Sequence, residues 1–122
     1  MILGVGTDMI EIIRVEKACQ KKKFLERVYT IREQELYRDS PSKLAGNFAV
    51  KEAVVKVFGT GFHGIEPREI EVLRDEYGKP YINLYGNAKK KQEQLEITNI
   101  QVSITNTKEY AMSFVIGENE KR

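Results

Sequence analysis

The chain has 122 residues, with 20 lysines and arginines, 18 aspartates and glutamates, and a net charge of +2. We place one domain at residues 1–122, since a chain of this length builds a core without a disulfide or structural metal. Its only cysteine, Cys19, excludes an internal disulfide and a thiolate zinc site. No apolar run approaches the roughly 20 residues that cross a bilayer, and the N-terminus lacks the features of an export signal. We therefore expect a cytoplasmic protein that binds no membrane.

The first half of the chain predicts one strand and three helices. Residues 1–7 read as a short buried strand, and helical spacing of apolar residues then predicts a helix over about 9–21. A capping-box pattern predicts a short helix over 30–38. A serine followed by proline starts a longer helix over 41–58, which Gly59 ends.

The second half predicts mostly strands. Residues 69–74 and 80–85 read as a hairpin, and 87–95 as a polar, exposed helix. Strict alternation of apolar and polar residues predicts a terminal antiparallel hairpin with strands at 100–105 and 110–116. The predicted fold class is α+β, an antiparallel sheet packed against helices with one long central helix.

One carboxylate stands out on the central helix, at 41–58. Glu52 shares a sector of that helix with Phe48 and Val55, and most other positions are apolar. A buried carboxylate without a partner costs several kcal/mol or takes up a proton, so Glu52 needs a cation. Lys56, four residues on, offers an ordinary ion pair of about 0.3 kcal/mol. A structural pair and a functional site are both open at this point.

Asp8 is a second carboxylate among apolar residues, directly after the first predicted strand. Because Asp8 and Glu11 also match a capping box, Asp8 has an ordinary interpretation as the cap of the first helix. Two carboxylates on rigid elements would nevertheless suit Mg²⁺, which prefers oxygen ligands and leaves positions open for water and phosphate.

Five short motifs span nearly the whole chain. They are Gly6-Thr7-Asp8, F-A-V-K-E-A-V-V-K-V at 48–57, Gly59-Thr60-Gly61, Gly78-Lys79-Pro80-Tyr81 and V-S-I-T at 102–105. On these motifs the chain closely resembles the holo-[acyl carrier protein] synthases, the small bacterial 4′-phosphopantetheinyl transferases. The resemblance implies the fold of that family and a homotrimer with active sites at the subunit boundaries.

The resemblance also implies an activity. It is transfer of the 4′-phosphopantetheine group of CoA to a serine of apo acyl carrier protein, which supports fatty acid biosynthesis and releases adenosine 3′,5′-bisphosphate. By resemblance, Asp8 and Glu52 bind Mg²⁺ as the metal cofactor, and Lys56 is a catalytic residue beside the CoA phosphates. The group that takes the serine proton, a metal-bound water or one of the carboxylates, stays open.

A set of residues in or beside the motifs is implied to bind CoA. It consists of Lys51, Lys56, Gly59, Thr60, Gly61, Lys79, Pro80, Ser103, Thr105 and Asn106. Gly59 has an ordinary interpretation as a helix stop, and Lys79-Pro80 as part of a hairpin turn.

Two residues depart from the family pattern. Asn106 stands where the family usually has a histidine near the CoA phosphates and the metal, and Asn47 stands where an arginine is common. Asparagine can hydrogen-bond a phosphate but carries no charge, so we expect altered CoA affinity. A catalytically weak relative that only binds CoA or the carrier protein is therefore the alternative function. His63 is predicted to be a surface loop residue.

Basic residues are concentrated between Arg14 and Arg27, where six of them accompany two glutamates. By resemblance, this surface docks the acidic recognition helix of acyl carrier protein. The residues implied are Arg14, Lys21, Lys22, Lys23, Phe24 and Arg27. A solvated face is the ordinary alternative. We do not expect a nucleic-acid partner, because no exposed aromatic platform is predicted near the lysines.

Overall fold

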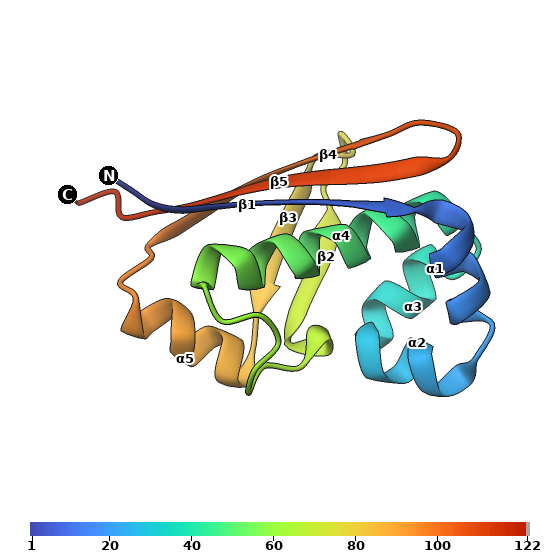
Figure 1. Ribbon diagram of the computed structural model, residues 1–122, viewed down its shortest axis with the longest axis horizontal. Coiled ribbons are helices and arrows are strands. Elements are labelled where there is room, and N and C mark those ends of the chain that lie inside the picture. Colours follow the sequence, from blue (N-terminus) through green and yellow to red (C-terminus); the bar gives the residue numbers. More distant parts are fainter. Residues whose placement is uncertain (122) are drawn as a thin grey trace.

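The computed structural model describes residues 1–121 and confirms the α+β class (Figure 1). The strands are β1 Ile2–Glu11, β2 Ile70–Arg74, β3 Pro80–Leu84, β4 Asn99–Asn106 and β5 Tyr110–Glu118. The helices are α1 Ile12–Cys19, α2 Lys22–Val28, α3 Ile31–Tyr37, α4 Pro41–Phe58 and α5 Gly86–Gln94, with a 3-10 turn at Pro67–Glu69. Within the described part of the chain, no helix has the length and apolar character to cross a membrane.

Two antiparallel sheets enclose the central helix. β1, β5 and β4 form a three-stranded sheet in that order, and β2 pairs with β3 in a second sheet whose strand β3 lies beside β4. In Figure 1 the three-stranded sheet lies above α4, α1 to α3 gather at one end of that helix, and α5 lies below its other end. α4 therefore occupies the middle of the molecule and positions whatever its side chains carry.

The bounds of α4 agree with the sequence prediction. The Ser40 side chain accepts a hydrogen bond of 3.4 Å from the backbone N–H of Lys43, and proline follows at the first helical position. Gly59 ends the helix in the left-handed conformation with φ 76°, which a residue without Cβ adopts at little cost. Eleven of its residues are buried, so the helix is covered nearly all round.

A glycine brings β1 against α4. A Cβ built on Gly6 would lie 2.0 Å from the carbonyl oxygen of Ala53, closer than any real contact allows. Only glycine therefore lets the two backbones approach this closely, which explains the first residue of the Gly6-Thr7-Asp8 motif. As a result, the carboxylate two residues later faces the second half of α4.

The structure corrects the predicted boundary between the first strand and the first helix. β1 continues to Glu11 because β5 supplies partners as far as Tyr110, and α1 starts only at Ile12. Asp8 therefore lies inside a strand, opposite Ser113, and its interpretation as a helix cap is wrong. Sequence reasoning also missed α2, a helix of seven residues too short for its pattern to be read.

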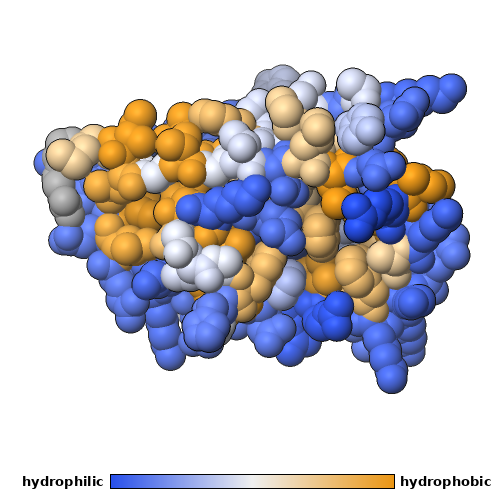
Figure 2. Space-filling view, viewed as in Figure 1, coloured by the Kyte–Doolittle hydropathy of each residue, from blue (hydrophilic) through white to orange (hydrophobic). Residues whose placement is uncertain are grey.

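The outer face of the three-stranded sheet is apolar and exposed. Val5 and Met9 of β1 and Met112 and Phe114 of β5 keep 54%, 61%, 43% and 41% of their surface exposed. The register places Met9 opposite Met112, so these side chains form one continuous surface. Figure 2 shows apolar side chains gathered on the side of the molecule where β1 starts. Exposed apolar patches of this kind mark surfaces that other molecules cover.

Candidate active site

Asp8, Glu52 and Lys56 meet where β1 passes the second half of α4. The Lys56 ammonium donates a 2.7 Å hydrogen bond to the Thr7 carbonyl oxygen, and its Nζ lies 3.4 Å from Asp8 Oδ1. Glu52 lies one helical turn before Lys56, on the same side of α4. Lys56 therefore makes its ion pair with Asp8 on the neighbouring strand, rather than with Glu52 of its own helix.

The two carboxylates influence one another. Burial raises the pKa of the Asp8 carboxyl, and Lys56 acts against this rise. Burial also raises the pKa of the Glu52 carboxyl, and the nearby charge of Asp8 raises it further, with Lys56 opposing. One ammonium thus faces two half-buried carboxylates, an arrangement with surplus negative charge.

This donor set fits a divalent cation. Two carboxylates on a strand and a helix offer hard oxygen ligands in fixed positions, and both are open enough for water or a phosphate to complete the coordination. A bound cation would also relieve the repulsion that raises the pKa of Glu52. Among the described residues no group of three or more histidine, cysteine, aspartate or glutamate side chains forms a metal site. Asp8 and Glu52 would therefore share the ion with solvent or substrate.

Lys51 lies on a different side of α4 and is completely buried. Its Nζ lies 2.8 Å from Glu33 Oε1, and it also donates to the carbonyl oxygens of Pro67 and Ile70. Burial lowers the pKa of the Lys51 ammonium, while Glu33 acts in the opposite direction. The prediction that Lys51 binds CoA is corrected, because no part of its side chain is open to a ligand.

Asn47 belongs to the same buried cluster as Lys51. Its Nδ2 donates 3.0 Å hydrogen bonds to Glu33 Oε2 and to the Val72 carbonyl oxygen. The side chain is fully buried, so it does not line a phosphate site, and the expectation that Asn47 weakens CoA binding directly is corrected.

The other residues implied to bind CoA are spread over two ends of α4. Gly59, Thr60 and Gly61 follow its last residue, whereas Pro80 and Asn106 line a pocket at its start. α4 has 18 residues, which separates its ends by about 27 Å. Within one chain these two groups of residues do not meet.

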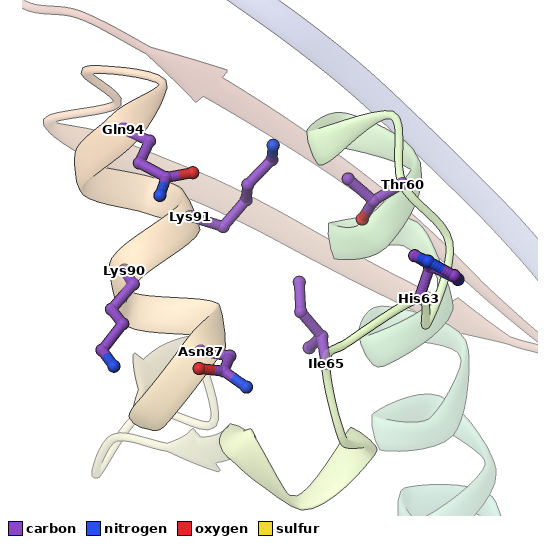
Figure 3. A pocket seen from close by; sticks show the side chains of 7 residues that line it. All are labelled: Thr60, His63, Ile65, Asn87, Lys90, Lys91 and Gln94. Carbon is purple, nitrogen blue, oxygen red and sulfur yellow. The ribbon is translucent and has the colours of Figure 1, made fainter.

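A cavity of about 420 Å³ lies beside the glycine-rich segment (Figure 3). Thr60 and His63 line it from the loop after α4, and Lys90 and Lys91 line it from α5. Figure 3 shows the two lysine side chains pointing in opposite directions. His63 is exposed, as predicted, and the polar helix α5 buries only Ala88.

Ser103 and Thr105 lie on the outer face of the three-stranded sheet. They are exposed and sit opposite Phe114 and Met112 of β5, whereas Ile104 between them packs into the core. Thr7 of β1 lies opposite Phe114 and is therefore on the outer face. Neighbouring residues of a strand point to opposite faces, so Asp8 points to the inner face of the sheet. Ser103 and Thr105 are thus separated from Asp8 by the sheet itself.

The basic residues of α1, α2 and the turn between them are exposed. Arg14, Lys21, Lys22, Lys23 and Arg27 are all exposed, whereas Phe24 is partly buried and its ring packs against Tyr29 and Phe48. The Arg27 guanidinium lies 5.9 Å from the centre of the Phe24 ring. A cation over an aromatic ring beside further lysines is an arrangement suited to an acidic partner with an apolar contact.

Sequence reasoning missed Glu33, Arg74 and Lys43. Glu33 was read only as part of a capping box, yet its carboxylate also pairs with Lys51 and accepts from Asn47. Arg74 ends β2 and Lys43 lies in the first turn of α4, and both line the pocket that Pro80 and Asn106 also line. A lone arginine at a strand end gives no pattern, so only the structure brings it to this pocket.

Comparison with known proteins decides the family. The profile of the 4′-phosphopantetheinyl transferase superfamily matches residues 4–115. The chain belongs to this superfamily. It is 61% identical over 118 residues to a holo-[acyl-carrier-protein] synthase of Lachnoclostridium phytofermentans, covering 97% of both chains. The resemblance read from the five motifs is thereby confirmed, and so is the expectation of an enzyme.

Solved structures give the same result. The crystal structure of the holo-[acyl-carrier-protein] synthase from Neisseria meningitidis matches with a TM-score of 0.88 and 29% identity, over 98% of this chain and 100% of that one. The Helicobacter pylori synthase in complex with coenzyme A matches with a TM-score of 0.84 and 31% identity, over 93% and 99%. The expected fold family is confirmed.

Proposed function

We propose that this enzyme transfers the 4′-phosphopantetheine group of CoA to a serine of apo acyl carrier protein, with Mg²⁺ as cofactor, and releases adenosine 3′,5′-bisphosphate. The observation that carries the proposal is the meeting of Asp8, Glu52 and Lys56 on β1 and α4. The relatives named as holo-[acyl-carrier-protein] synthases, and the neighbour in complex with coenzyme A, support the choice of substrates.

Asp8 and Glu52 hold the metal in this proposal. Mg²⁺ there would offset negative charge on the CoA pyrophosphate as the bond to the leaving group breaks. The serine oxygen bonds to the phosphorus that carries the pantetheine arm, and the bond from that phosphorus to the bridging oxygen of the nucleotide breaks. The serine proton passes to a base, which is a metal-bound water or one of the two carboxylates.

Lys56 is proposed to bind a phosphate oxygen of CoA and to offset the negative charge there. Its ammonium is anchored by the Thr7 carbonyl oxygen while its side chain stays about half exposed. A lysine held this way keeps donor positions free for a phosphate oxygen. It also favours the ionised form of Asp8, because it opposes the rise that burial causes in the pKa of that carboxyl.

We infer that the active enzyme is a homotrimer in which each CoA contacts residues of two copies. Two observations support this proposal. The outer sheet face of Val5, Met9, Met112 and Phe114 is apolar and exposed. The residues implied to bind CoA lie at opposite ends of α4, or on opposite faces of the sheet, so a neighbouring copy would bring the missing part of the site.

Acyl carrier protein would dock on the basic surface formed by α1 and α2. The surface lies directly after the end of β1, the strand that carries Asp8, so a partner seated there can present its serine to the site.

We place the enzyme in the cytoplasm, in keeping with its free cysteine, Cys19. Lys79 lies exposed in the β2–β3 turn and is kept as a proposed contact of CoA.

The test is a transfer assay with purified components. Apo acyl carrier protein, CoA and Mg²⁺ are incubated with the enzyme, and the intact mass of the carrier protein is followed. We expect a gain of one phosphopantetheine arm with the wild type and with Glu35→Gln, a control on the exposed face of α3, and no gain with Glu52→Gln. A wild type that binds CoA without transferring the arm would favour the alternative, a binding relative weakened by Asn106.

A further inference from the structure

The Glu33 side chain joins α3, α4 and β2 inside the protein. Its Oε1 lies 2.8 Å from Lys51 Nζ, and its Oε2 accepts a 3.0 Å hydrogen bond from Asn47 Nδ2. The backbone N–H groups of Thr30 and Val72 also donate to this carboxylate, at 3.0 Å and 3.3 Å. The side chains of Glu33, Asn47 and Lys51, called here the Glu33 junction, are fully buried. One carboxylate therefore connects two side chains of α4 to the start of α3 and the middle of β2.

The apolar residues of α4 do not select one rotation of this helix about its axis. At about 100° per residue, the buried residues Ala45, Ala53, Val54 and Val55 point to four different sides of the helix. A helix with one apolar face is held in one rotation by the burial of that face, whereas a helix that is apolar nearly all round lacks this restraint. The rotation of α4 therefore needs polar contacts that reach fixed partners.

The Glu33 junction provides such contacts. Asn47 and Lys51 lie four residues apart on one side of α4, and both donate to the Glu33 carboxylate. The contact between β1 and α4 acts differently, because Gly6 approaches the carbonyl oxygen of Ala53, a backbone atom that every residue carries. That contact fixes the distance between strand and helix, and the Glu33 junction fixes which side of the helix faces α3.

Stability alone does not account for the Glu33 junction. Burial of an ion pair costs hydration free energy, and apolar residues of the same size often support a fold equally well. Asn47 Oδ1 is buried and has no hydrogen-bond partner in the part of the chain that the structure describes, which lowers stability further. Buried polar groups can instead specify one arrangement among several, as a single asparagine does in coiled coils.

The rotation of α4 decides where the side chains of the candidate active site point. Lys51 and Glu52 are neighbours in the chain, so a rotation of the helix moves both together. Lys56, one turn after Glu52, reaches β1 and donates a 2.7 Å hydrogen bond to the Thr7 carbonyl oxygen. A rotation by one residue, about 100°, would bring Glu52 to the place of Lys51 beside Glu33 and would take Lys56 away from β1.

We propose that Glu33 is a positioning residue for the transfer reaction. Through Asn47 and Lys51 it fixes the rotation of α4, and it thereby directs Glu52 toward Asp8. This inference rests on the proposed function, because it needs these two carboxylates to share a metal ion. Glu33 itself is fully buried and acts only through the helix.

A charge-free junction separates positioning from stability. Glu33→Leu combined with Lys51→Met leaves no charge unpaired, so this double variant should have a higher urea midpoint than Lys51→Met alone. Under conditions in which it is fully folded, we expect Mn²⁺ affinity and kcat each to fall at least about tenfold. KM for apo acyl carrier protein should not change, because the basic residues of α1 and α2 are untouched. Either Mn²⁺ affinity or kcat at the wild-type value would overturn the proposal.

Two further variants serve as matched controls. Ile97→Ala opens a cavity at a buried residue between α5 and β4, so it should lower stability and leave the Mn²⁺ affinity of the folded enzyme unchanged. Glu33→Gln combined with Lys51→Met also removes both charges but keeps an acceptor for Asn47, and it should recover part of the lost affinity. A loss in either control as large as that of the Glu33→Leu double variant would overturn the proposal.

Crystal structures of the metal-free wild type and the Glu33→Leu double variant test the rotation without metal or transfer. We expect α4 to be rotated in the variant and the hydrogen bond from Lys56 to the Thr7 carbonyl oxygen to be lost. An unrotated α4 would overturn the positioning role and leave the proposed function standing. A rotated α4, with a wild type that transfers no phosphopantetheine, would overturn the proposed function and leave the control of the helix standing. If the double variant does not fold, Asn47→Ala decides, and unchanged Mn²⁺ affinity there would overturn the proposal.

Discussion

α4 carries two lysines that look alike in the sequence and differ in their surroundings. On one side, Lys51 is fully buried and meets Glu33 and two backbone carbonyls. On the other, Lys56 is about half exposed and serves two half-buried carboxylates, Asp8 and Glu52. The two lysines belong to the same K-E-A-V-V-K segment, five residues apart.

The difference teaches which charges support the fold and which are available for chemistry. The Lys51 cluster has its charges paired, and Lys51, Glu33 and Asn47 are fully buried, so the cluster is closed to a ligand. The Asp8, Glu52 and Lys56 group has an excess of negative charge that burial makes unfavourable. A charge arrangement that the chain leaves incomplete is one that a cation and an anionic substrate can complete.

The largest expected effect comes from breaking the buried pair. Lys51→Met leaves the Glu33 carboxylate buried without its cation and should lower the free energy of unfolding by about 3–5 kcal/mol. Urea denaturation measures it, with Lys56→Met as the matched lysine on the same helix. Because the Lys56 ion pair is partly exposed, that control should cost no more than about 1 kcal/mol. Equal losses in both variants would contradict the distinction between the two groups.

The second effect is on transfer rather than on stability. Glu52→Gln should lower kcat/KM at least about a hundredfold, since it removes one of two charged oxygen ligands of the metal. Its free energy of unfolding should not fall, because burial and Asp8 already disfavour the charged carboxylate. Steady-state kinetics measure kcat/KM, and urea denaturation of the same preparation measures the free energy of unfolding. A destabilised variant with unimpaired transfer would place Glu52 among the structural residues instead.

Lys56→Met should have a smaller effect, lowering kcat/KM by about 10- to 100-fold. The loss has two sources: one fewer cation near the phosphates, and an Asp8 carboxyl whose pKa rises further once the ammonium is gone. Part of the lost rate should therefore return as the pH is raised, because the remaining carboxylates become fully ionised. A pH–rate profile of kcat/KM with this shape in the variant and not in the wild type is the expected result.

The smallest effect concerns two exposed lysines of α2. The double change Lys22→Glu and Lys23→Glu on α2 should raise KM for apo acyl carrier protein by roughly tenfold or less and leave kcat unchanged. Added salt should raise KM in the wild type and hardly affect it in the variant, since exposed charges are screened. The same variants made at Lys89 and Lys90 of α5 are the control. An equal response at both surfaces would identify a general charge effect and no docking site.

The sequence was sufficient for most elements because local signals and burial agreed. The serine cap, the proline and the terminal glycine of α4 all function as their types predict. The capping box of Thr30 and Glu33 is present with both hydrogen bonds. The predicted strand is shorter than β1, because the true length of β1 depends on pairing with β5, about 100 residues away in the chain.

The candidate site was only partly accessible to the same reasoning. Glu52 was recognised because an acid among apolar residues is anomalous, and Asp8 because it follows a strand. Helical spacing placed Lys56 rather than Lys51 beside Glu52, but it does not tell which side of α4 is covered by which element, so it did not show that Lys51 is buried. The partner of Lys51 comes from α3, and Arg74 reaches its pocket from β2, both through contacts between distant segments.

The most direct measurement is binding of Mn²⁺ as a spectroscopic substitute for Mg²⁺, followed by electron paramagnetic resonance in the presence of CoA. We expect the wild type and Glu35→Gln to bind the ion, and Asp8→Asn and Glu52→Gln each to lose at least about tenfold in affinity, because the two carboxylates share it. Unchanged Mn²⁺ affinity in either variant, with the fold intact, would contradict the assignment of Asp8 and Glu52 as a joint metal site.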